Sequence, residues 1–99
     1  MNIKILPSAL DDLSAGYEFY ESQLEGLGSF FLDTLFFDID SLKLYAGMHN
    51  KVFGQYRLLS KRFPYAIYYL IDSKDVLINA VLDCRRNPNW IKKRLDIES

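Results

Sequence analysis

The sequence predicts an α+β fold, with an N-terminal strand and helix hairpin packed on an antiparallel β-sheet and a short C-terminal helix. Three observations predict it. Apolar residues in the first half of the chain recur at helical spacing, and after Asn50 they recur at the two-residue spacing of strands. The last observation is Asn87-Pro88 followed by a basic segment, which is typical of an N-cap and the first residue of a short helix.

The chain begins with a short strand and a first helix. Alternating residues 3–5 predict a strand that ends at Pro7. Ser8 followed by Asp11 is a capping-box pattern, so we expect Ser8 to cap the helix. Gly16 is expected to permit close packing against another element. The predicted apolar stripe of this helix consists of Leu10, Leu13, Tyr17, Tyr20, Leu24 and Leu27.

A second helix follows after a break at Gly26 and Gly28, and Ser29 is expected to cap it. Gly47 is expected to end it. Two helices joined by so short a link form an antiparallel hairpin. Most acidic residues fall outside the apolar stripes, which predicts a negative outer face. The stripe of the second helix consists of Phe31, Leu35, Ile39, Leu42 and Tyr45.

Residues 52–59, 65–71 and 76–84 are rich in β-branched and aromatic residues and predict three strands. Turns at 60–62 and 72–75 are short, so the strands form an antiparallel meander. The middle strand is apolar on both faces, which predicts a central position. We expect the N-terminal strand to join this sheet.

Length and composition limit the class of protein. With 99 residues the chain forms one domain, 1–99, and with Cys84 alone it forms no internal disulfide. No segment approaches the roughly 18 apolar residues that cross a bilayer, and the N-terminus lacks a signal-peptide pattern. We therefore expect a cytoplasmic protein. No Cys/His cluster or glycine-rich loop is present, so neither a metal nor a cofactor is expected.

Charge divides the chain into two halves. Residues 1–50 carry two lysines and eight acidic residues, for a net charge of −6. Residues 51–99 carry ten Lys or Arg and five acidic residues, for a net charge of +5. Any anionic partner is therefore expected to meet the C-terminal half.

A set of residues and short segments spread along nearly the whole chain carries a resemblance to a known family: Ser8, Ala9, Asp12, Leu13, Gly28, Phe31, Tyr56-Arg57, the segment 63–69 and the segment 80–88. With the predicted elements in this order, the chain resembles the RelE/ParE superfamily of toxins, of the plasmid-stabilisation type. The resemblance implies the toxin of a type II toxin–antitoxin system, which inhibits growth and is held inactive by a cognate antitoxin. One branch of the family cleaves ribosome-bound messenger RNA, and the other inhibits DNA gyrase.

A ribonuclease of this kind needs a proton acceptor, a proton donor and cations around the phosphate. The cations available for this role are Arg57, Lys61 and Arg85. Arginine stays charged and moves no proton, and the only histidine, His49, precedes the predicted strands. At the C-terminal position where the nuclease branch has Tyr or His, this chain has Trp90 or Ile91. The sequence therefore favours a binding inhibitor over an enzyme, and the resemblance implies gyrase as the best candidate target.

For binding of the target or the antitoxin, the sequence points to five residues: Arg57, Arg62, Arg85, Arg86 and Trp90. Each has a structural alternative. Arg57 can pair with Asp83 across the sheet, and the Arg85-Arg86 pair is a solvated strand end in many proteins. Trp90 either caps the sheet or anchors a partner. Cys84 is expected to be a small buried residue. An inactive orphan member of the family remains a third hypothesis beside the inhibitor and the nuclease.

Overall fold

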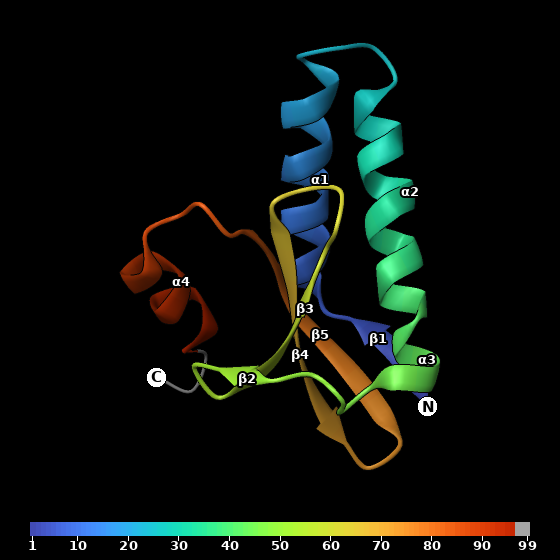
Figure 1. Ribbon diagram of the computed structural model, residues 1–99, viewed down its shortest axis with the longest axis vertical. Coiled ribbons are helices and arrows are strands. Elements are labelled where there is room, and N and C mark those ends of the chain that lie inside the picture. Colours follow the sequence, from blue (N-terminus) through green and yellow to red (C-terminus); the bar gives the residue numbers. More distant parts are fainter. Residues whose placement is uncertain (97–99) are drawn as a thin grey trace.

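The computed structural model of the chain describes residues 1–96 and confirms the predicted α+β class (Figure 1). Two long helices stand side by side on one face of a sheet, and a short helix lies against the other face. The elements in chain order are β1 (Asn2–Ile5), α1 (Pro7–Glu21), α2 (Leu27–Asp40), α3 (Leu42–Tyr45), β2 (Lys51–Val52), β3 (Gln55–Leu59), β4 (Tyr65–Asp72), β5 (Asp75–Asp83) and α4 (Pro88–Leu95).

The sheet has the strand order β1-β5-β4-β3-β2, so β4 occupies the predicted central position. The meander β3–β4–β5 is antiparallel, as expected. The N-terminal strand β1 joins the sheet next to β5 but runs parallel to it, so the sheet is mixed rather than antiparallel. A tight turn forces the two strands that it joins to run antiparallel. Strand β1 is instead connected to the rest of the sheet through the whole helix hairpin, which does not fix its direction. Local sequence therefore could not predict its direction.

Helix α1 buries only part of the predicted stripe: Leu13 and Tyr20 face inward as expected, together with Ala9 and Gly16, which were not predicted as part of it. Leu10 and Leu24 of the predicted stripe are exposed by 49% and 65%. The small residue Gly16 faces α2 so closely that a Cβ there would lie 2.5 Å from Phe31 Cζ, which confirms its expected packing role. The stripe is shifted because small residues permit this close approach. The buried residues of α1 are Ala9, Leu13, Gly16 and Tyr20.

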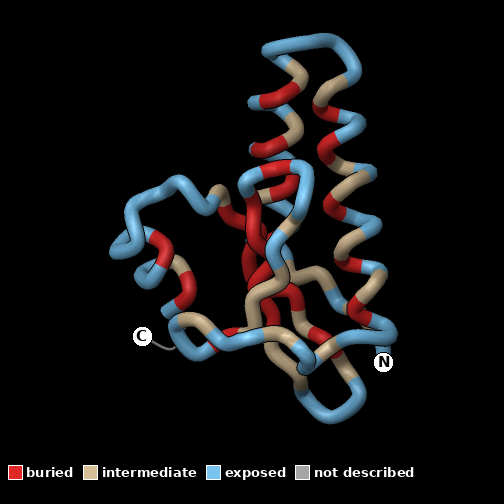
Figure 2. Tube along the Cα trace, viewed as in Figure 1, coloured by how far each residue is buried: buried red, intermediate tan, exposed pale blue. Residues whose placement is uncertain are grey.

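The second predicted stripe is confirmed, except for Tyr45, which is half exposed. The buried residues are Phe31, Leu35 and Ile39 of α2 and Leu42 of α3. They meet the face of the sheet that contains Tyr65, Ile67 and Tyr69. Figure 2 shows this buried layer between the hairpin and the sheet.

The predicted serine caps are wrong for both helices. Helix α1 begins one residue before Ser8, at Pro7, and the Ser8 hydroxyl donates to the carbonyl of Asn79 instead. Helix α2 begins at Leu27, two residues before Ser29. The Glu21 carboxylate accepts hydrogen bonds from the N–H groups of Gly26 and Gly28 at this helix start. A carboxylate from the end of the preceding helix has replaced the predicted serine cap of α2.

The predicted strand 52–59 is divided into β2 and β3. Phe53 and Gly54 both have positive φ, 53° and 83°, and form the turn between the two strands. This is the backbone of a two-residue hairpin turn, where glycine is favoured and phenylalanine is not. The aromatic residue concealed the turn in the sequence.

Helix α4 covers the second face of the sheet. Asn87 caps it as predicted, because the Asn87 side chain accepts from the N–H of Asn89 and Pro88 is the first helical residue. Ile91 and Leu95 pack on the sheet, which contributes Ala66, Tyr68, Ala80 and Leu82 to this second cluster. The buried amide of Gln55 donates to the Leu95 carbonyl at 3.1 Å and ties the helix end to the sheet.

Candidate functional site

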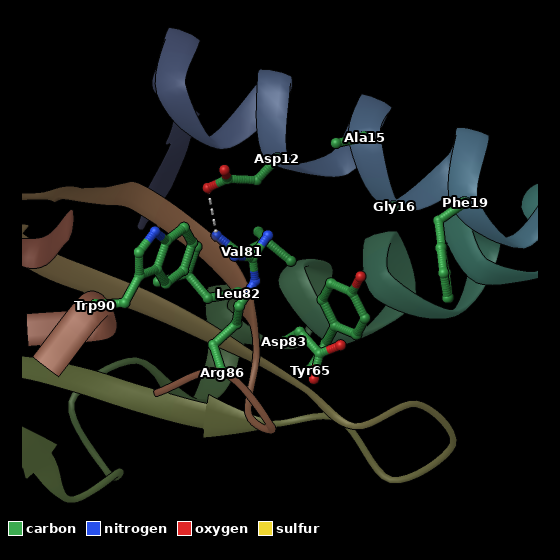
Figure 3. Close-up of a pocket in the computed structure, with 10 residues that line it drawn as sticks. All are labelled: Asp12, Ala15, Gly16, Phe19, Tyr65, Val81, Leu82, Asp83, Arg86 and Trp90. Carbon is green, nitrogen blue, oxygen red and sulfur yellow. Dashed lines mark hydrogen bonds between the residues drawn. The ribbon is translucent and has the colours of Figure 1, made fainter. Parts of the chain in front are cut away.

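A cleft of about 320 Å³ lies between α1, the end of β5 and the start of α4 (Figure 3). Its walls combine aromatic, charged and small residues from these three elements, from the start of β4 and from the loop before α4. The residues that line it are Asp12, Ala15, Gly16, Phe19, Tyr65, Val81, Leu82, Asp83, Arg86 and Trp90.

One wall of the cleft is held in place by Asp12 of α1. Its carboxylate accepts a hydrogen bond from the backbone N–H of Val81 at 3.0 Å. It also receives both terminal nitrogens of Arg94 in α4, each at 2.8 Å. A bidentate arginine–carboxylate pair of this kind fixes geometry as well as charge. Asp12 therefore joins α1, β5 and α4, a role that its position in the sequence does not reveal.

The end of β5 carries a second bidentate pair. Arg85 donates through Nε and Nη2 to the two oxygens of Asp83, at 3.0 and 2.7 Å. These hydrogen bonds hold the pKa of Asp83 below its ordinary value. The partner of Asp83 is therefore Arg85, and the predicted alternative in which Arg57 pairs with Asp83 is wrong. Arg85 is local to Asp83, so the pair forms without bringing distant strands together.

Tyr65 is the phenol that lines this cleft. Burial raises the pKa of Tyr65 to about 12, so its hydroxyl stays protonated at neutral pH. Such a group donates a hydrogen bond but does not act as a base. At this position the cleft thus offers a phenol donor rather than a phenolate base.

Trp90 and Arg86 form the rim of the cleft. The guanidinium carbon of Arg86 lies 4.2 Å from the centroid of the Trp90 ring, in a cation–π contact. Trp90 retains 36% of its exposure, so it does not cap the sheet as a buried residue. An exposed tryptophan beside an arginine is a combination typical of binding hot spots.

Arg57 lies on the opposite face of the sheet from Arg85. On β3 it is directly across from Tyr68, and its charge acts on Tyr68 and Cys84. The charge of Arg85 acts on Tyr20 and Tyr65, which belong to the cluster under the helix hairpin.

Cys84 was expected to be a small buried residue, and this prediction is wrong. It is exposed and lies near Arg57. It lies one residue past the end of β5, where the chain leaves the sheet and α4 does not cover it. Desolvation nevertheless raises the pKa of its thiol, which keeps it neutral and weakly reactive.

Lys61 and Arg62 lie apart from both Arg57 and Arg85, in the loop between β3 and β4. Arg62 lies over the ring of Phe30 in α2, with 5.7 Å between its guanidinium carbon and the ring centroid. Lys61 lines the same shallow groove, beside Asp38. The structure therefore does not bring Arg57, Lys61 and Arg85 together around one point.

The only histidine lies outside the cleft. His49 Nδ1 is 2.5 Å from the hydroxyl of Tyr69, which also accepts from the N–H of Gly47. Burial lowers the pKa of His49. Within residues 1–96, no group of three His, Cys, Asp or Glu is arranged to hold a metal ion. In the same part of the chain no helix is long and apolar enough to cross a membrane.

Comparison with solved structures identifies the same fold in a chain described as "Chromosomal ParDE TA system from P. aeruginosa". The superposition has a TM-score of 0.71 at 22% sequence identity and covers 82% of this chain and 92% of the other. No protein-family model and no curated protein matches the sequence. The chain thus has a ParE-like α+β fold, which is the fold that the resemblance implied.

Proposed function

We propose that this protein is the toxin component of a type II toxin–antitoxin module. It inhibits growth by binding an essential target, for which DNA gyrase is the best candidate, and a cognate antitoxin neutralises it in the cytoplasm. The similarity in fold to a chain of a ParDE toxin–antitoxin system supports the proposal. Fold alone does not define function, so the site must distinguish an inhibitor from a nuclease.

The observation that carries the choice of an inhibitor is the separation of the cations. Arg57 and Arg85 lie on opposite faces of the sheet, and Lys61 lies beside α2. Cleavage of RNA requires cations and proton-transfer groups around one phosphate. Tyr65 keeps its proton, and His49 contacts Tyr69 away from the cleft. This arrangement suits binding better than proton transfer.

The residues proposed for target or antitoxin binding differ in how available they are. Arg86 and Trp90 present an exposed cation and ring at the rim of the cleft. Arg85 is already neutralised by Asp83, so its contribution is smaller. Arg57 and Arg62 lie on other surfaces and would serve a partner that wraps around the chain.

The experiment is induced expression of the chain, alone and with its cognate antitoxin. Growth, plasmid supercoiling and the 5′ ends of cellular messages are followed together. We expect growth arrest and altered supercoiling with intact messages, and rescue by the antitoxin. The variant with both Arg86→Ala and Trp90→Ala, shown to be folded, should lose the arrest.

Two outcomes would replace this proposal. Position-specific cleavage of ribosome-bound RNA would establish the nuclease hypothesis, with Arg57, Lys61 and Arg85 the residues to replace first. Expression without any growth defect would favour an inactive orphan member. Purified protein assayed with gyrase in vitro separates a direct effect on the enzyme from a secondary response of the cell.

A further inference from the structure

The edge of β5 is only partly covered by another strand. Strand β1 pairs with residues 75–78 and then leaves the sheet, with a last hydrogen bond from the N–H of Leu6 to the carbonyl of Ile78. The register with β4 then shifts, because Tyr68 pairs with Ala80 and Tyr69 with Ile78. Asn79 is therefore the extra residue of a β-bulge, which changes the residues that face the open edge.

Past the bulge, the backbone groups of β5 point alternately to β4 and to the open edge. The N–H of Cys84 donates to the carbonyl of Pro64, on the β4 side. The N–H groups of Val81 and Asp83 consequently point to the opposite edge, and that of Val81 reaches Asp12. No described strand pairs with this edge beyond Ile78.

The N–H and carbonyl groups of Val81 and Asp83 are the four backbone groups on this edge, and two of them already form hydrogen bonds. The N–H of Val81 is bound by Asp12, and the carbonyl of Asp83 accepts from the N–H of Arg86. For the carbonyl of Val81 and the N–H of Asp83, no hydrogen bond on this edge is found within residues 1–96, and both residues line the cleft. In a parallel pair of strands, the N–H of one residue donates to a carbonyl of the neighbouring strand, and its own carbonyl accepts from the N–H two residues further along that strand. The Val81 carbonyl and the Asp83 N–H have this spacing.

The cleft along this edge has the room and the surroundings for a short chain segment. Ala15 and Gly16 of α1 leave it wide, and its volume of about 320 Å³ is that of a few residues. Phe19 and Trp90 are partly exposed aromatic side chains at this cleft (Figure 3). Arg86 stacks on Trp90 and forms no ion pair within the described residues, so its charge is available.

We propose that this cleft binds an extended, acidic peptide segment of a partner protein that runs parallel to β5. The N–H of its central residue donates to the Val81 carbonyl, and the carbonyl of the same residue accepts from the Asp83 N–H. The peptide thus pairs with β5 beyond the point where β1 leaves the sheet. Apolar side chains of the peptide pack against Phe19 and Trp90, which lie at the two ends of the cleft (Figure 3), and a carboxylate of the peptide meets Arg86. A nucleic-acid backbone fits poorly, because its phosphates only accept hydrogen bonds and the Val81 carbonyl offers no donor. The inference holds whether or not the chain inhibits growth.

The probe is a set of end-blocked pentapeptides with acidic flanking residues and a varied central residue. Trp90 is the only tryptophan of the chain, so its fluorescence reports on the cleft directly. We expect at least one peptide to give a saturable change. Hydrogen exchange at the Asp83 amide should slow on binding, and methylation of the central peptide nitrogen should weaken binding about tenfold by removing one hydrogen bond.

A matched pair of variants locates the binding. Ala15→Leu fills the cleft from an exposed position of α1 and should weaken peptide binding at least as much as N-methylation does. Ser14→Leu changes the neighbouring exposed residue, which lines a groove on another side of α1, and should leave binding unchanged. Circular dichroism checks that both variants are folded.

The proposal is overturned if no peptide of the set gives saturable fluorescence up to millimolar concentration. It is equally overturned if Asp83 exchanges at the same rate with bound peptide, or if the N-methylated peptide binds as well as its parent. Equal effects of Ala15→Leu and Ser14→Leu would place the peptide elsewhere.

Discussion

The helix hairpin and α4 cover opposite faces of one sheet, and they are attached by different forces. The hairpin is held by packed aromatic rings, with Phe31 at 4.9–5.2 Å from the ring centroids of Tyr20, Phe63 and Tyr65. Helix α4 buries only Ile91 and Leu95 and depends on directional polar contacts for the rest. Apolar packing supplies most of the stability, whereas the polar contacts set the position of Trp90 beside the cleft.

The largest effect on stability is expected from Phe31→Ala. Phe31 is fully buried at the centre of the aromatic cluster, so its removal should lower the free energy of unfolding by about 3–5 kcal/mol. Denaturant titration of the purified protein measures this. Phe37→Ala on the same helix is the control, because Phe37 is 77% exposed and should change stability by about 0.5 kcal/mol or less. Similar losses in both variants would show that the hairpin is not held by this cluster.

The second prediction concerns Trp90 of α4, the exposed aromatic residue beside the cleft. Trp90→Ala should weaken binding of the cognate antitoxin by about 2 kcal/mol or more, because an exposed tryptophan loses its whole contact area with a partner. Calorimetric titration measures the dissociation constant, and a thermal melt checks folding. An unchanged constant in a folded variant would remove Trp90 from the interface.

Local patterns in the sequence revealed the elements of the fold. Strand alternation located β4 and β5, and Asn87-Pro88 located the start of α4. The candidate site depended on residues far apart in the chain. Asp12 and Arg94 are separated by 82 positions, and no local signal connects them. The β-bulge at Asn79 is equally invisible, because only the register with β4 reveals it.

The third prediction tests the polar attachment of α4. Asp12→Ala leaves Arg94 and the N–H of Val81 without their acceptor, so we expect a loss of about 1–2 kcal/mol in unfolding free energy. Amide hydrogen exchange should rise more in α4 than in α2. Asp11→Ala, at the exposed neighbouring position, is the control and should leave both quantities nearly unchanged. Uniformly faster exchange across α2 and α4 would contradict a separate role for the polar contacts.

The smallest effects come from two carboxylates, one in each region, whose pKa values are shifted in opposite directions. Burial raises the pKa of Asp38 in α2, and the neighbouring Ser60 and Lys61 oppose this shift without cancelling it. Hydrogen bonds from Arg85 lower the pKa of Asp83. A raised folded pKa means that stability is gained as the pH falls through it, whereas a lowered one means that stability is lost as the pH falls.

Asp38→Asn should therefore raise the melting temperature at about pH 7 by a few degrees at most, and Asp83→Asn should lower it. Both differences should shrink as the pH falls toward about 3, the Asp38 difference first because its pKa is raised and the Asp83 difference last because its pKa is lowered. Thermal melts of the three proteins at both pH values measure this, and each variant serves as the control of the other. Changes of the same sign in both variants at neutral pH would contradict the opposite roles of the two carboxylates. We therefore expect the charge of Asp38, on the hairpin side, to lower stability. The charge of Asp83 should raise stability, because its pairing with Arg85 holds the end of β5 in place.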